Sequence, residues 1–522
     1  MRVYKSHHPD VHIPDTTVSQ LVMDGISTRL SEPVLVDGHS GRSVTGAELA
    51  DGIRRFAGGL LSRGLGSGAV TAILLPNIPE FATVFHGIAW AGGTATPMNA
   101  AYTAPEIRHQ LQASGARLAV TIPPLLEQLE EAIPGTGVEE IVVIGDSGDH
   151  TSLEDFFGEP VEAQMPVDPA THLVSLPYSS GTTGLPKGVM LTHRNLVSNI
   201  CQADAFLKVQ PGEVTLGVLP YFHIYGKMIL NLYLARGGAH VTMMRFDLEQ
   251  ALQLIQDHRM KMLYVVPPIV LGLAKHPMVD KFDLSSVEGV LSGAAPLGAD
   301  LGRACAGRIG CRALQGYGMT EASPVTHLIP RDDEHHGSAG LVVPNVECRI
   351  ISAQTGADVE PGEEGELLVR GPNVMTGYLN NPDATAKTLD ADGWLHTGDV
   401  ARVDDEGYFF VVDRVKELIK YKGFQVAPAE IEALLVTHPA VADVAVIGRP
   451  DDESGEVPMA VIQPTPDMDK VTLAELQDFL STRTAKYKQI QDLRYVEAIP
   501  KSASGKILRR VLRDELLEPE PA

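Results

Sequence analysis

The run PYSSGTTGLPKGV, from Pro177 to Val189, carries the strongest information about the fold of this chain. It is rich in glycine, proline and hydroxyl side chains, which form helix and strand interiors poorly, so we expect a loop. Glycines let several backbone amides turn toward one point, the hydroxyls add donors, and Lys187 supplies positive charge. The run therefore predicts a loop that binds phosphate groups.

This loop differs from the phosphate loop of Walker-type NTPases. The pattern G-x-x-x-x-G-K-[ST], counted from Gly181, would require a glycine where Pro186 stands and a hydroxyl where Gly188 follows Lys187. A solvent-exposed flexible turn is the alternative for a segment rich in glycine and serine. The ordered series of hydroxyls that ends in a lysine favours phosphate binding, but not by a Walker-type protein.

The composition indicates a protein of several domains that acts on small molecules. The chain has 522 residues, 44% of them hydrophobic and 21% charged, with a formal net charge of -24. Such a length exceeds one hydrophobic core, and the negative charge argues against nucleic acid as a partner. The 4 cysteines show no metal-ligand or disulfide spacing. Without a signal peptide or a membrane-spanning apolar run, we expect a cytoplasmic protein.

Apolar runs and turn signals divide the chain into regions with different patterns of predicted secondary structure. Short strands alternate with helical patterns over 34–121 and again over 212–291, which predicts mostly parallel sheets covered by helices. After Arg331, turn signals separate short strands such as GELLVRG, as in a small antiparallel sheet or distorted barrel. We predict an α/β fold in which residues 1–413 form two α/β subdomains plus a small distorted β-barrel, and residues 414–522 form a small α+β domain.

Six motifs in order along the chain resemble those of the adenylate-forming superfamily, which contains acyl-CoA synthetases, peptide-synthetase adenylation domains and beetle luciferases. The segments FHIYG, VVPPIVLGLAKHP and LSGAAPLG are similar to the 4-coumarate:CoA ligase subfamily. The resemblance implies an ATP- and Mg²⁺-dependent ligase that joins a carboxylic acid to coenzyme A through an acyl-adenylate. The motifs are YSSGTTGLPKGVMLTHRN, QGYGMTE (315–321), GELLVRG (365–371), GWLHTGDV (393–400), VDRVKELIKYKGFQVAPAEIE (412–432) and PKSASGKILRR (500–510).

The resemblance also implies which residues would bind the nucleotide. Thr320 would contact the α-phosphate, Glu321 would help to hold Mg²⁺, and Asp399 and Arg414 would contact the ribose. Taken alone, Glu321 would be an ordinary surface carboxylate and Asp399 a turn residue. The β- and γ-phosphates would lie against Ser179, Ser180, Gly181, Thr182, Thr183 and Lys187, and the adenine against Gln315, Gly316 and Tyr317.

The C-terminal domain would supply the remaining catalytic groups and would be mobile. Lys506 would orient the carboxylate and the α-phosphate during adenylation, although composition alone also allows a solvated basic tail. In the family this domain rotates between the two half-reactions, which places a hinge near Lys416. In the second pose Lys420 and Gln425 would contact the nucleotide and the acyl-adenylate, and Lys422 and Gly423 would approach CoA.

The residues that would form the acyl pocket carry the weakest sequence signals. His223 would gate the carboxylate, although a histidine there could also be merely packed. Lys227 departs from the subfamily, which usually has an apolar residue there. If it faced the pocket it would suit an acid with a second polar or anionic group, but its spacing from Tyr225 and Ile229 on a helix predicts a solvent-facing side chain. Residues matching the family's acyl pocket are Phe222, Tyr225, Ala294, Ala295, Gly318, Pro324 and Val325.

We therefore expect an aryl or cinnamic-type acid as the substrate. A medium-chain fatty acid is the next candidate, since small residues in the pocket would also admit an acyl chain. Loading of a carrier protein and a luciferase-like oxygenase are the more distant alternatives. The sequence leaves open whether the protein is a monomer or a homodimer.

Overall fold

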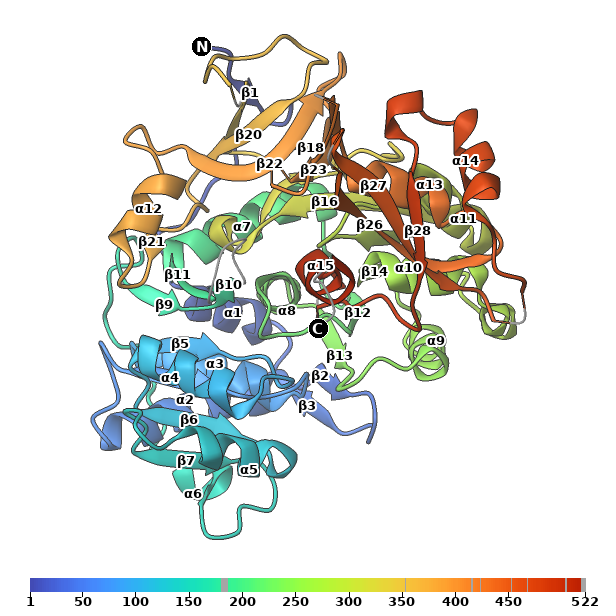
Figure 1. Ribbon diagram of the computed structural model, residues 1–522. Coiled ribbons are helices and arrows are strands. Elements are labelled where there is room, and N and C mark those ends of the chain that lie inside the picture. Colours follow the sequence, from blue (N-terminus) through green and yellow to red (C-terminus); the bar gives the residue numbers. More distant parts are fainter. Residues whose placement is uncertain are drawn as a thin grey trace.

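The computed structural model describes residues 1–522 except 180–185, 353, 415, 423, 452, 467, 503–504 and 518–522, and it gives the backbone but not the side chain of Gln425. Within the described residues the strands form five sheets, flanked by helices. Figure 1 shows an α/β region in blue, a mainly antiparallel region in orange and a C-terminal region in red. This arrangement confirms the predicted α/β fold class.

The first α/β subdomain is built on the sheet β10-β11-β9-β5-β4-β6-β7-β8, in which the central strands are parallel and the phosphate-loop strands β10 and β11 are antiparallel. The run AVTAILLPN forms β4, and IPEFATVFHGIAWAGG forms α3, as predicted. The strands are β4 (Val70–Ile73), β5 (Thr94–Pro97), β6 (Leu118–Thr121), β7 (Glu140–Val143), β8 (Thr151–Ser152), β9 (Leu173–Ser175), β10 (Tyr178–Ser179), β11 (Lys187–Thr192) and β21 (Gly377–Tyr378), which pairs with β11. The helices are α1 (Val18–Ser27), α2 (Gly46–Ser62), α3 (Glu80–Trp90), α4 (Ala104–Ser114), α5 (Pro123–Ala132), α6 (Leu153–Phe156) and α7 (His193–Leu207).

The second α/β subdomain contains two sheets, ordered β12-β13-β2-β3 and β14-β15-β16-β17-β18. Parallel pairing of β14, β15 and β16 brings the ends of these strands to one edge, where the QGYGMTE motif forms the last part of β16 and continues beyond it. The strands are β2 (Pro33–Asp37), β3 (Ser43–Thr45), β12 (Val214–Gly217), β13 (Ala239–Thr242), β14 (Met262–Val265), β15 (Gly289–Ser292), β16 (Arg312–Gly318), β17 (Val325–Leu328) and β18 (Leu341–Val342). The helices are α8 (Ile224–Ala235), α9 (Leu248–Asp257), α10 (Pro267–Lys275), η1 (Pro277–Lys281), α11 (Ala299–Ile309) and η2 (Thr320–Ala322).

The third part of the N-terminal region is the antiparallel sheet β1-β19-β20-β22-β23, as the turn signals predicted. Its first strand comes from the start of the chain, because Tyr4 pairs with Cys348. The elements are β1 (Tyr4–Lys5), β19 (Glu347–Ile351), β20 (Gly365–Arg370), α12 (Pro382–Thr388), β22 (Leu395–Val403) and β23 (Phe409–Arg414).

The chain leaves this sheet at Arg414 and enters the sheet of the C-terminal region, β25-β24-β27-β26 with β28 on β27, at Ile419. That region packs on the second α/β subdomain: Lys275 Nζ donates to the carbonyl of Val436 at 3.2 Å, and a Cβ on Gly505 would lie 3.3 Å from Val266. The elements are β24 (Ile419–Tyr421), β25 (Phe424–Val426), α13 (Pro428–Leu435), β26 (Val441–Asp451), β27 (Gly455–Pro464), α14 (Leu473–Ser481), η3 (Lys486–Lys488), β28 (Asp492–Tyr495) and α15 (Arg509–Leu517).

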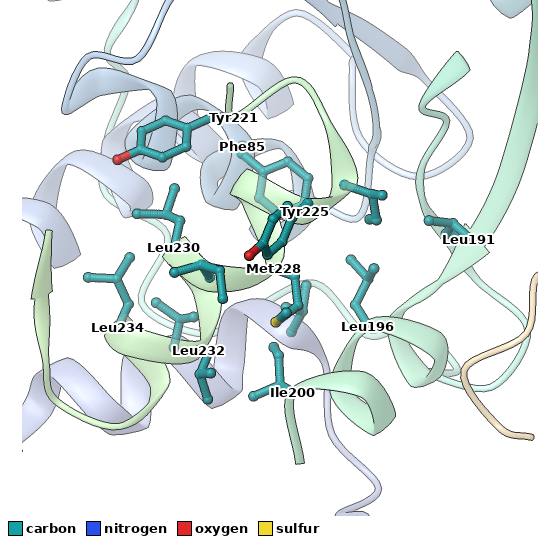
Figure 2. Packing of buried hydrophobic residues seen from close by; sticks show 14 of the residues in the cluster. Phe85, Leu191, Leu196, Ile200, Tyr221, Tyr225, Met228, Leu230, Leu232 and Leu234 are labelled. Carbon is teal, nitrogen blue, oxygen red and sulfur yellow. The ribbon is translucent and has the colours of Figure 1, made fainter. Parts of the chain in front are cut away.

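Helix α8 runs through the largest hydrophobic core, which also contains Phe85 of α3, Leu191 of β11 and Leu196 of α7 (Figure 2). Every residue of α8 before its last is buried. The prediction that Lys227 faces solvent is therefore wrong, since only 1% of this residue is exposed. A helix that packs on all sides has no solvent face to which a lysine could point.

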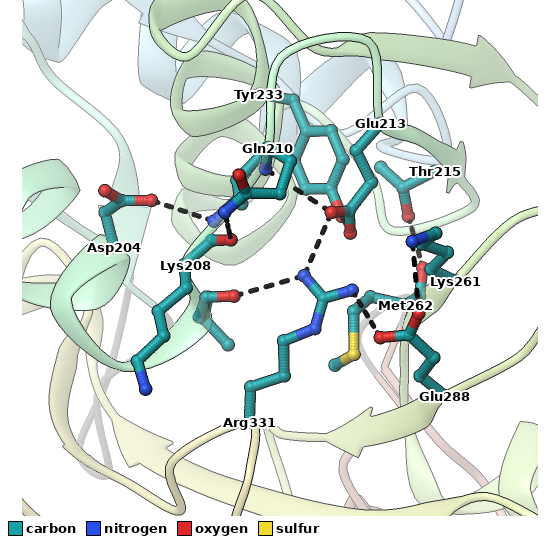
Figure 3. Close-up of polar contacts among 12 residues, drawn as sticks. Asp204, Lys208, Gln210, Glu213, Thr215, Tyr233, Lys261, Met262, Glu288 and Arg331 are labelled. Carbon is teal, nitrogen blue, oxygen red and sulfur yellow. Dashed lines mark hydrogen bonds and ion pairs between the residues drawn. The ribbon is translucent and has the colours of Figure 1, made fainter.

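An ion-pair network around a buried carboxylate joins the second subdomain to the segment after β17. Arg331 donates to Glu213 at 2.9 Å and to Glu288 at 3.0 Å, and the Tyr233 hydroxyl donates to Glu213 at 3.2 Å (Figure 3). The side chain of Glu213 is only 2% exposed, so its charge depends on these partners. Across the described ranges, no helix is long and apolar enough to cross a membrane.

Candidate active site

The phosphate loop and the QGYGMTE motif meet at the carboxylate of Glu321. This residue lies in η2, directly after β16, and its Oε1 accepts hydrogen bonds from Ser179 Oγ at 2.9 Å and from the Tyr378 hydroxyl at 2.8 Å. Lys187 Nζ lies 5.0 Å from the centre of the Tyr378 ring. The structure therefore brings Ser179, Lys187 and Glu321 together. Ser180, Gly181, Thr182 and Thr183 lie outside the described residues.

This corner fits the Mg²⁺ ion that the sequence implies. Mg²⁺ commonly binds one or two protein carboxylates and completes its coordination with water and substrate phosphates. Glu321 is a buried carboxylate, 6% exposed, and both hydrogen bonds go to the same oxygen, Oε1. No cluster of three potential ligand side chains occurs in the part of the chain that is described, so phosphate oxygens would have to supply the rest.

Tyr317, Asp399 and Arg414 form a second polar group. The Tyr317 hydroxyl donates to Asp399 Oδ2 at 2.5 Å, and Arg414 Nε lies 3.2 Å from Asp399 Oδ1. Strand pairing sets this arrangement, because Asp399 of β22 stands opposite Arg414 of β23. The two residues predicted to contact ribose therefore lie side by side, and Tyr317, which is predicted to lie against the adenine, is hydrogen-bonded to one of them.

The other two residues predicted to line the adenine, Gln315 and Gly316, lie in contact with other parts of the protein. Gln315 uses both ends of its amide within the protein: its Oε1 accepts from the backbone N–H of Leu297, and its Nε2 donates to the carbonyl of Ser338 at 2.6 Å. A Cβ on Gly316 would lie 2.8 Å from Leu328. If Gln315 contacts the adenine, it would therefore do so through its backbone, because its side-chain amide is already bonded within the protein. The motif alone does not distinguish these two possibilities.

Lys506 reaches the nucleotide residues from the C-terminal region. Burial lowers the pKa of its ammonium and Arg414 lowers it further, whereas the carboxylates of Asp399 and Glu321 oppose that shift. Its backbone is held by a reciprocal pair, because Lys506 N donates to Ser502 Oγ at 3.2 Å and Ser502 N donates to Lys506 O at 2.8 Å. Lys506 therefore faces the same charged groups that the resemblance assigns to metal and ribose.

His223 caps the N-terminus of α8 and is held as one tautomer. Its Nδ1 accepts from the backbone N–H of Tyr225 at 3.2 Å. Burial lowers the pKa of the imidazole to about 3, and the positive charges of Lys506 and Lys227 add to this shift. A neutral imidazole that accepts at Nδ1 carries its proton on Nε2. His223 is thus a hydrogen-bond donor for a carboxylate or carbonyl oxygen, not a base.

A small cavity beside His223 joins the acid side of the site to the phosphate side. Phe222, His223 and Thr320 line it together with Tyr178 of β10. Asn99 and Tyr102 of the first α/β subdomain also line this cavity, and the motifs did not indicate them. Phe222, His223 and Thr320 are therefore neighbours, as the proposed roles require.

The remaining acyl-pocket residues divide into two sets. A Cβ on Gly293 would lie 2.9 Å from the Tyr225 ring, which places Tyr225 against the segment that continues to Ala294 and Ala295. Ala294 adopts φ +70, an unusual conformation for a residue with a side chain. Both alanines are partly exposed. Tyr225 and the two alanines therefore belong to one wall.

The second set lies where β16 turns into β17. A Cβ on Gly318 would lie 2.1 Å from the carbonyl oxygen of Pro324, so the space above this glycine is filled by backbone. Val325 is fixed by Asn199, which accepts from its N–H at 3.1 Å and donates to its carbonyl at 2.8 Å. Gly318 is thus required for a close backbone approach, and it does not enlarge the pocket as its size suggested.

The hairpin predicted to act in the second pose lies at the surface. Lys420 of β24 pairs with Gln425 of β25, and both Lys420 and Lys422 are exposed. Among the described residues, neither lysine makes a hydrogen bond or ion pair with the nucleotide-site residues. Gly423 lies outside the described part of the chain, and the roles of all four remain predictions.

Besides Asn99 and Tyr102, two further residues of this region were not indicated by the sequence. Tyr378 follows a glycine in a loop-like segment, and only the pairing of β21 with β11 brings it to Glu321. Ser175 lies in a short apolar strand, and its hydroxyl accepts from the buried Lys227 at 2.6 Å. No spacing rule connects either pair, because each contact joins segments far apart in the sequence.

These features define an adenylate-forming enzyme, with a phosphate loop, a carboxylate beside it, an aspartate and arginine pair, and a C-terminal lysine whose charge interacts with Glu321, Asp399 and Arg414. The chain belongs to the AMP-binding enzyme family, which it matches over residues 27–379, and it matches the AMP-binding enzyme C-terminal domain over residues 430–506.

Relatives and solved structures cover nearly the whole chain. It is 42% identical to 4-coumarate--CoA ligase 3 of Oryza sativa subsp. japonica, across 98% of this chain and 95% of that protein. It is 41% identical to a 4-coumarate--CoA ligase of Pinus taeda, across 98% of both. The crystal structure of ATP-bound MatB from Rhodopseudomonas palustris superposes with a TM-score of 0.87 at 29% identity, covering 96% of this chain and 99% of that chain.

Proposed function

We propose that this protein is an ATP-dependent acid:CoA ligase that acts on aryl or cinnamic-type carboxylic acids. Identity of 41–42% to 4-coumarate--CoA ligases along almost the whole chain is the observation that carries the proposal. The electrostatic interactions of Lys506 with both His223 and Glu321 support the same reaction.

In the first half-reaction the acid's carboxylate oxygen attacks the α-phosphorus of ATP, and the bond to pyrophosphate breaks. His223 would donate from Nε2 to the carboxylate, and Lys506 would place its positive charge between carboxylate and α-phosphate. Glu321 would hold Mg²⁺, which screens the phosphate charge when bound. Asp399 and Arg414 would fix the ribose, so that the α-phosphate lies in line with the attacking oxygen.

In the second half-reaction the thiol sulfur of CoA attacks the acyl carbonyl, AMP leaves, and the thiol proton is released. Lys506 has no task in this step, whereas Lys420, Lys422, Gly423 and Gln425 would act after a rotation of the C-terminal domain, residues 414–522, about the region of Lys416. The present arrangement, with Lys506 facing Glu321 and Asp399, suits the first half-reaction.

Pyrophosphate release measured with cinnamic, benzoic and medium-chain fatty acids, each with and without CoA, tests the proposal. We expect release with cinnamic-type acids and acyl-CoA formation only when CoA is present. Turnover of fatty acids alone would show that the acyl preference is wrong. No turnover of any acid would refute the ligase assignment itself.

The division of labour between half-reactions has its own test. Lys506→Ala should abolish pyrophosphate release but leave thioester formation from supplied acyl-AMP near the wild-type rate. Lys501→Ala in the same segment is the matched control, because Lys501 pairs with Asp443 and not with the nucleotide residues. An equal loss of both steps in Lys506→Ala would contradict the two-pose mechanism.

A further inference from the structure

Lys227 is a buried cation one helical turn behind His223. It lies in α8, is 1% exposed, and its backbone N–H donates to the His223 carbonyl at 3.1 Å. Its Nζ donates to Ser175 Oγ at 2.6 Å and lies 5.1 Å from the centre of the Phe85 ring. A hydroxyl and an aromatic face are partial compensation for a buried ammonium, which ordinarily requires a carboxylate.

The groups around Lys227 carry no negative charge. Burial lowers its pKa to about 7, and no described carboxylate offsets that shift. The titratable groups that face it are His86 of α3 and His223 at the start of α8, whose pKa values are lowered by burial and also by Lys227. Both imidazoles have a pKa of about 3 and are neutral near pH 7. When protonated, Lys227 is thus a positive charge in a low-dielectric interior that has no carboxylate partner among the described residues.

The hydrogen bond to Ser175 places the Lys227 charge where α8 meets β9. Ser175 ends β9, where it stands opposite Ala95 of β5 and Leu191 of β11. The chain continues from Ser175 through two residues to β10 and the phosphate loop. The bond from Lys227 therefore joins the helix that starts at His223 to the strand that leads into the phosphate loop.

We propose that Lys227 is a positioning residue that fixes the His223 end of α8 against β9 and holds a positive charge behind the carboxylate site. The proposal rests on the acid:CoA ligase function. The lysine does not touch the acid. It attracts the anion through the protein interior, where charges interact more strongly than in water. Lys506 also acts on His223, but it belongs to the C-terminal region, whereas Lys227 stays with the acid pocket when that region moves.

The test compares the pH dependence of KM for the acid between wild type and Lys227→Met, with pyrophosphate release as the readout. For the wild type we expect KM to rise roughly 3- to 10-fold between about pH 6 and about pH 9, as Lys227 loses its proton. In Lys227→Met the KM should be raised already at about pH 6 and should not show this step. Parallel profiles in the two proteins would overturn the proposal.

Ser175→Ala tests the same contact without removing the lysine. Loss of the acceptor should raise KM for the acid and move the step to lower pH, because the ammonium form loses its hydrogen bond. Ser198→Ala is the matched control, since the Ser198 hydroxyl is equally buried but has no hydrogen-bond partner among the residues that the structure describes. Identical behaviour of the two serine variants would overturn the proposal even if Lys227→Met does not fold.

The outcomes also separate this inference from the function on which it rests. No release of pyrophosphate by the wild type with any acid would refute both. Release by the wild type, with the same pH step in Lys227→Met, would refute the role of Lys227 alone.

Discussion

Replacement of Lys227 by methionine should make the protein more stable, and the gain should depend on pH. In the unfolded chain the lysine has its ordinary pKa of 10.5, and burial lowers this to about 7 in the folded state. Below about pH 7 the lysine is charged in both states, and folding must bury the charge. At 1.36 kcal/mol per pKa unit, the cost is about 5 kcal/mol at about pH 6 and about 2 kcal/mol at about pH 9.

The sign follows from proton binding. Between about pH 7 and pH 10.5 the unfolded state holds the lysine's proton and the folded state does not, so stability rises with pH. Methionine fills similar space without a charge and removes this dependence. The stabilisation of Lys227→Met over wild type should therefore shrink by about 3 kcal/mol from about pH 6 to about pH 9.

Urea unfolding of both proteins at the two pH values measures this difference. Lys281→Met serves as the control, because Lys281 is exposed and its replacement should change stability little at either pH. An equal free-energy difference between wild type and Lys227→Met at both pH values would show that the lysine does not titrate in the folded protein.

Three further changes test other parts of the structure. Arg331→Met should cost about 3 to 5 kcal/mol in urea unfolding, because Glu213 would stay buried and unpaired, and the added change Glu213→Gln should restore most of it. No recovery in the double variant would refute the pairing. Glu321→Gln should lower adenylation roughly 10²-fold, measured as pyrophosphate release at saturating acid, and an unchanged Mg²⁺ requirement would contradict its metal role. Arg509→Leu leaves the buried Glu432 without its cation and should destabilise the C-terminal region by about 3 kcal/mol. The variant should then be cleaved faster in limited proteolysis, and an unchanged cleavage rate would contradict the importance of this ion pair.

The strands and helices of the α/β regions could be predicted because their signals are local. The run from Val70 to Ile73 is apolar and short, and the run from Glu80 to Trp90 is apolar and long enough for a helix, so length alone separates them. The turn signals after Arg331 likewise predicted the antiparallel sheet. These features depend on neighbouring residues, which a sequence displays directly.

The environment of Lys227 could have been predicted, but from a different signal. Spacing along one helix turn places Lys227 on a different face of the helix from Tyr225 and Ile229. The spacing does not indicate whether that face is exposed to solvent or covered by other elements. The segment from Ile224 to Leu234 is apolar on all faces apart from Lys227 and Asn231. Such a helix is enclosed by the core, and a lysine within it is enclosed too.

Other contacts of the site lie beyond any local pattern. Tyr378 reaches Glu321 across 57 positions of sequence, and its contribution depends on how β21 meets β11. The QGYGMTE motif marks Gln315 but does not reveal that its amide bonds to Leu297 and Ser338. Motifs locate a site, whereas the partners of each polar group follow only from the tertiary packing.

The low pKa of the buried His223 imidazole has a consequence for how the enzyme responds to acidity. An ordinary histidine at a carboxylate site would charge near pH 6.5 and would impose its own fall in rate below that value. Because the pKa of His223 is about 3, it stays neutral through mildly acidic solution. The acidic side of the rate profile should then follow protonation of the substrate, so two acids of unequal strength should lose reactivity at different pH values with the same enzyme.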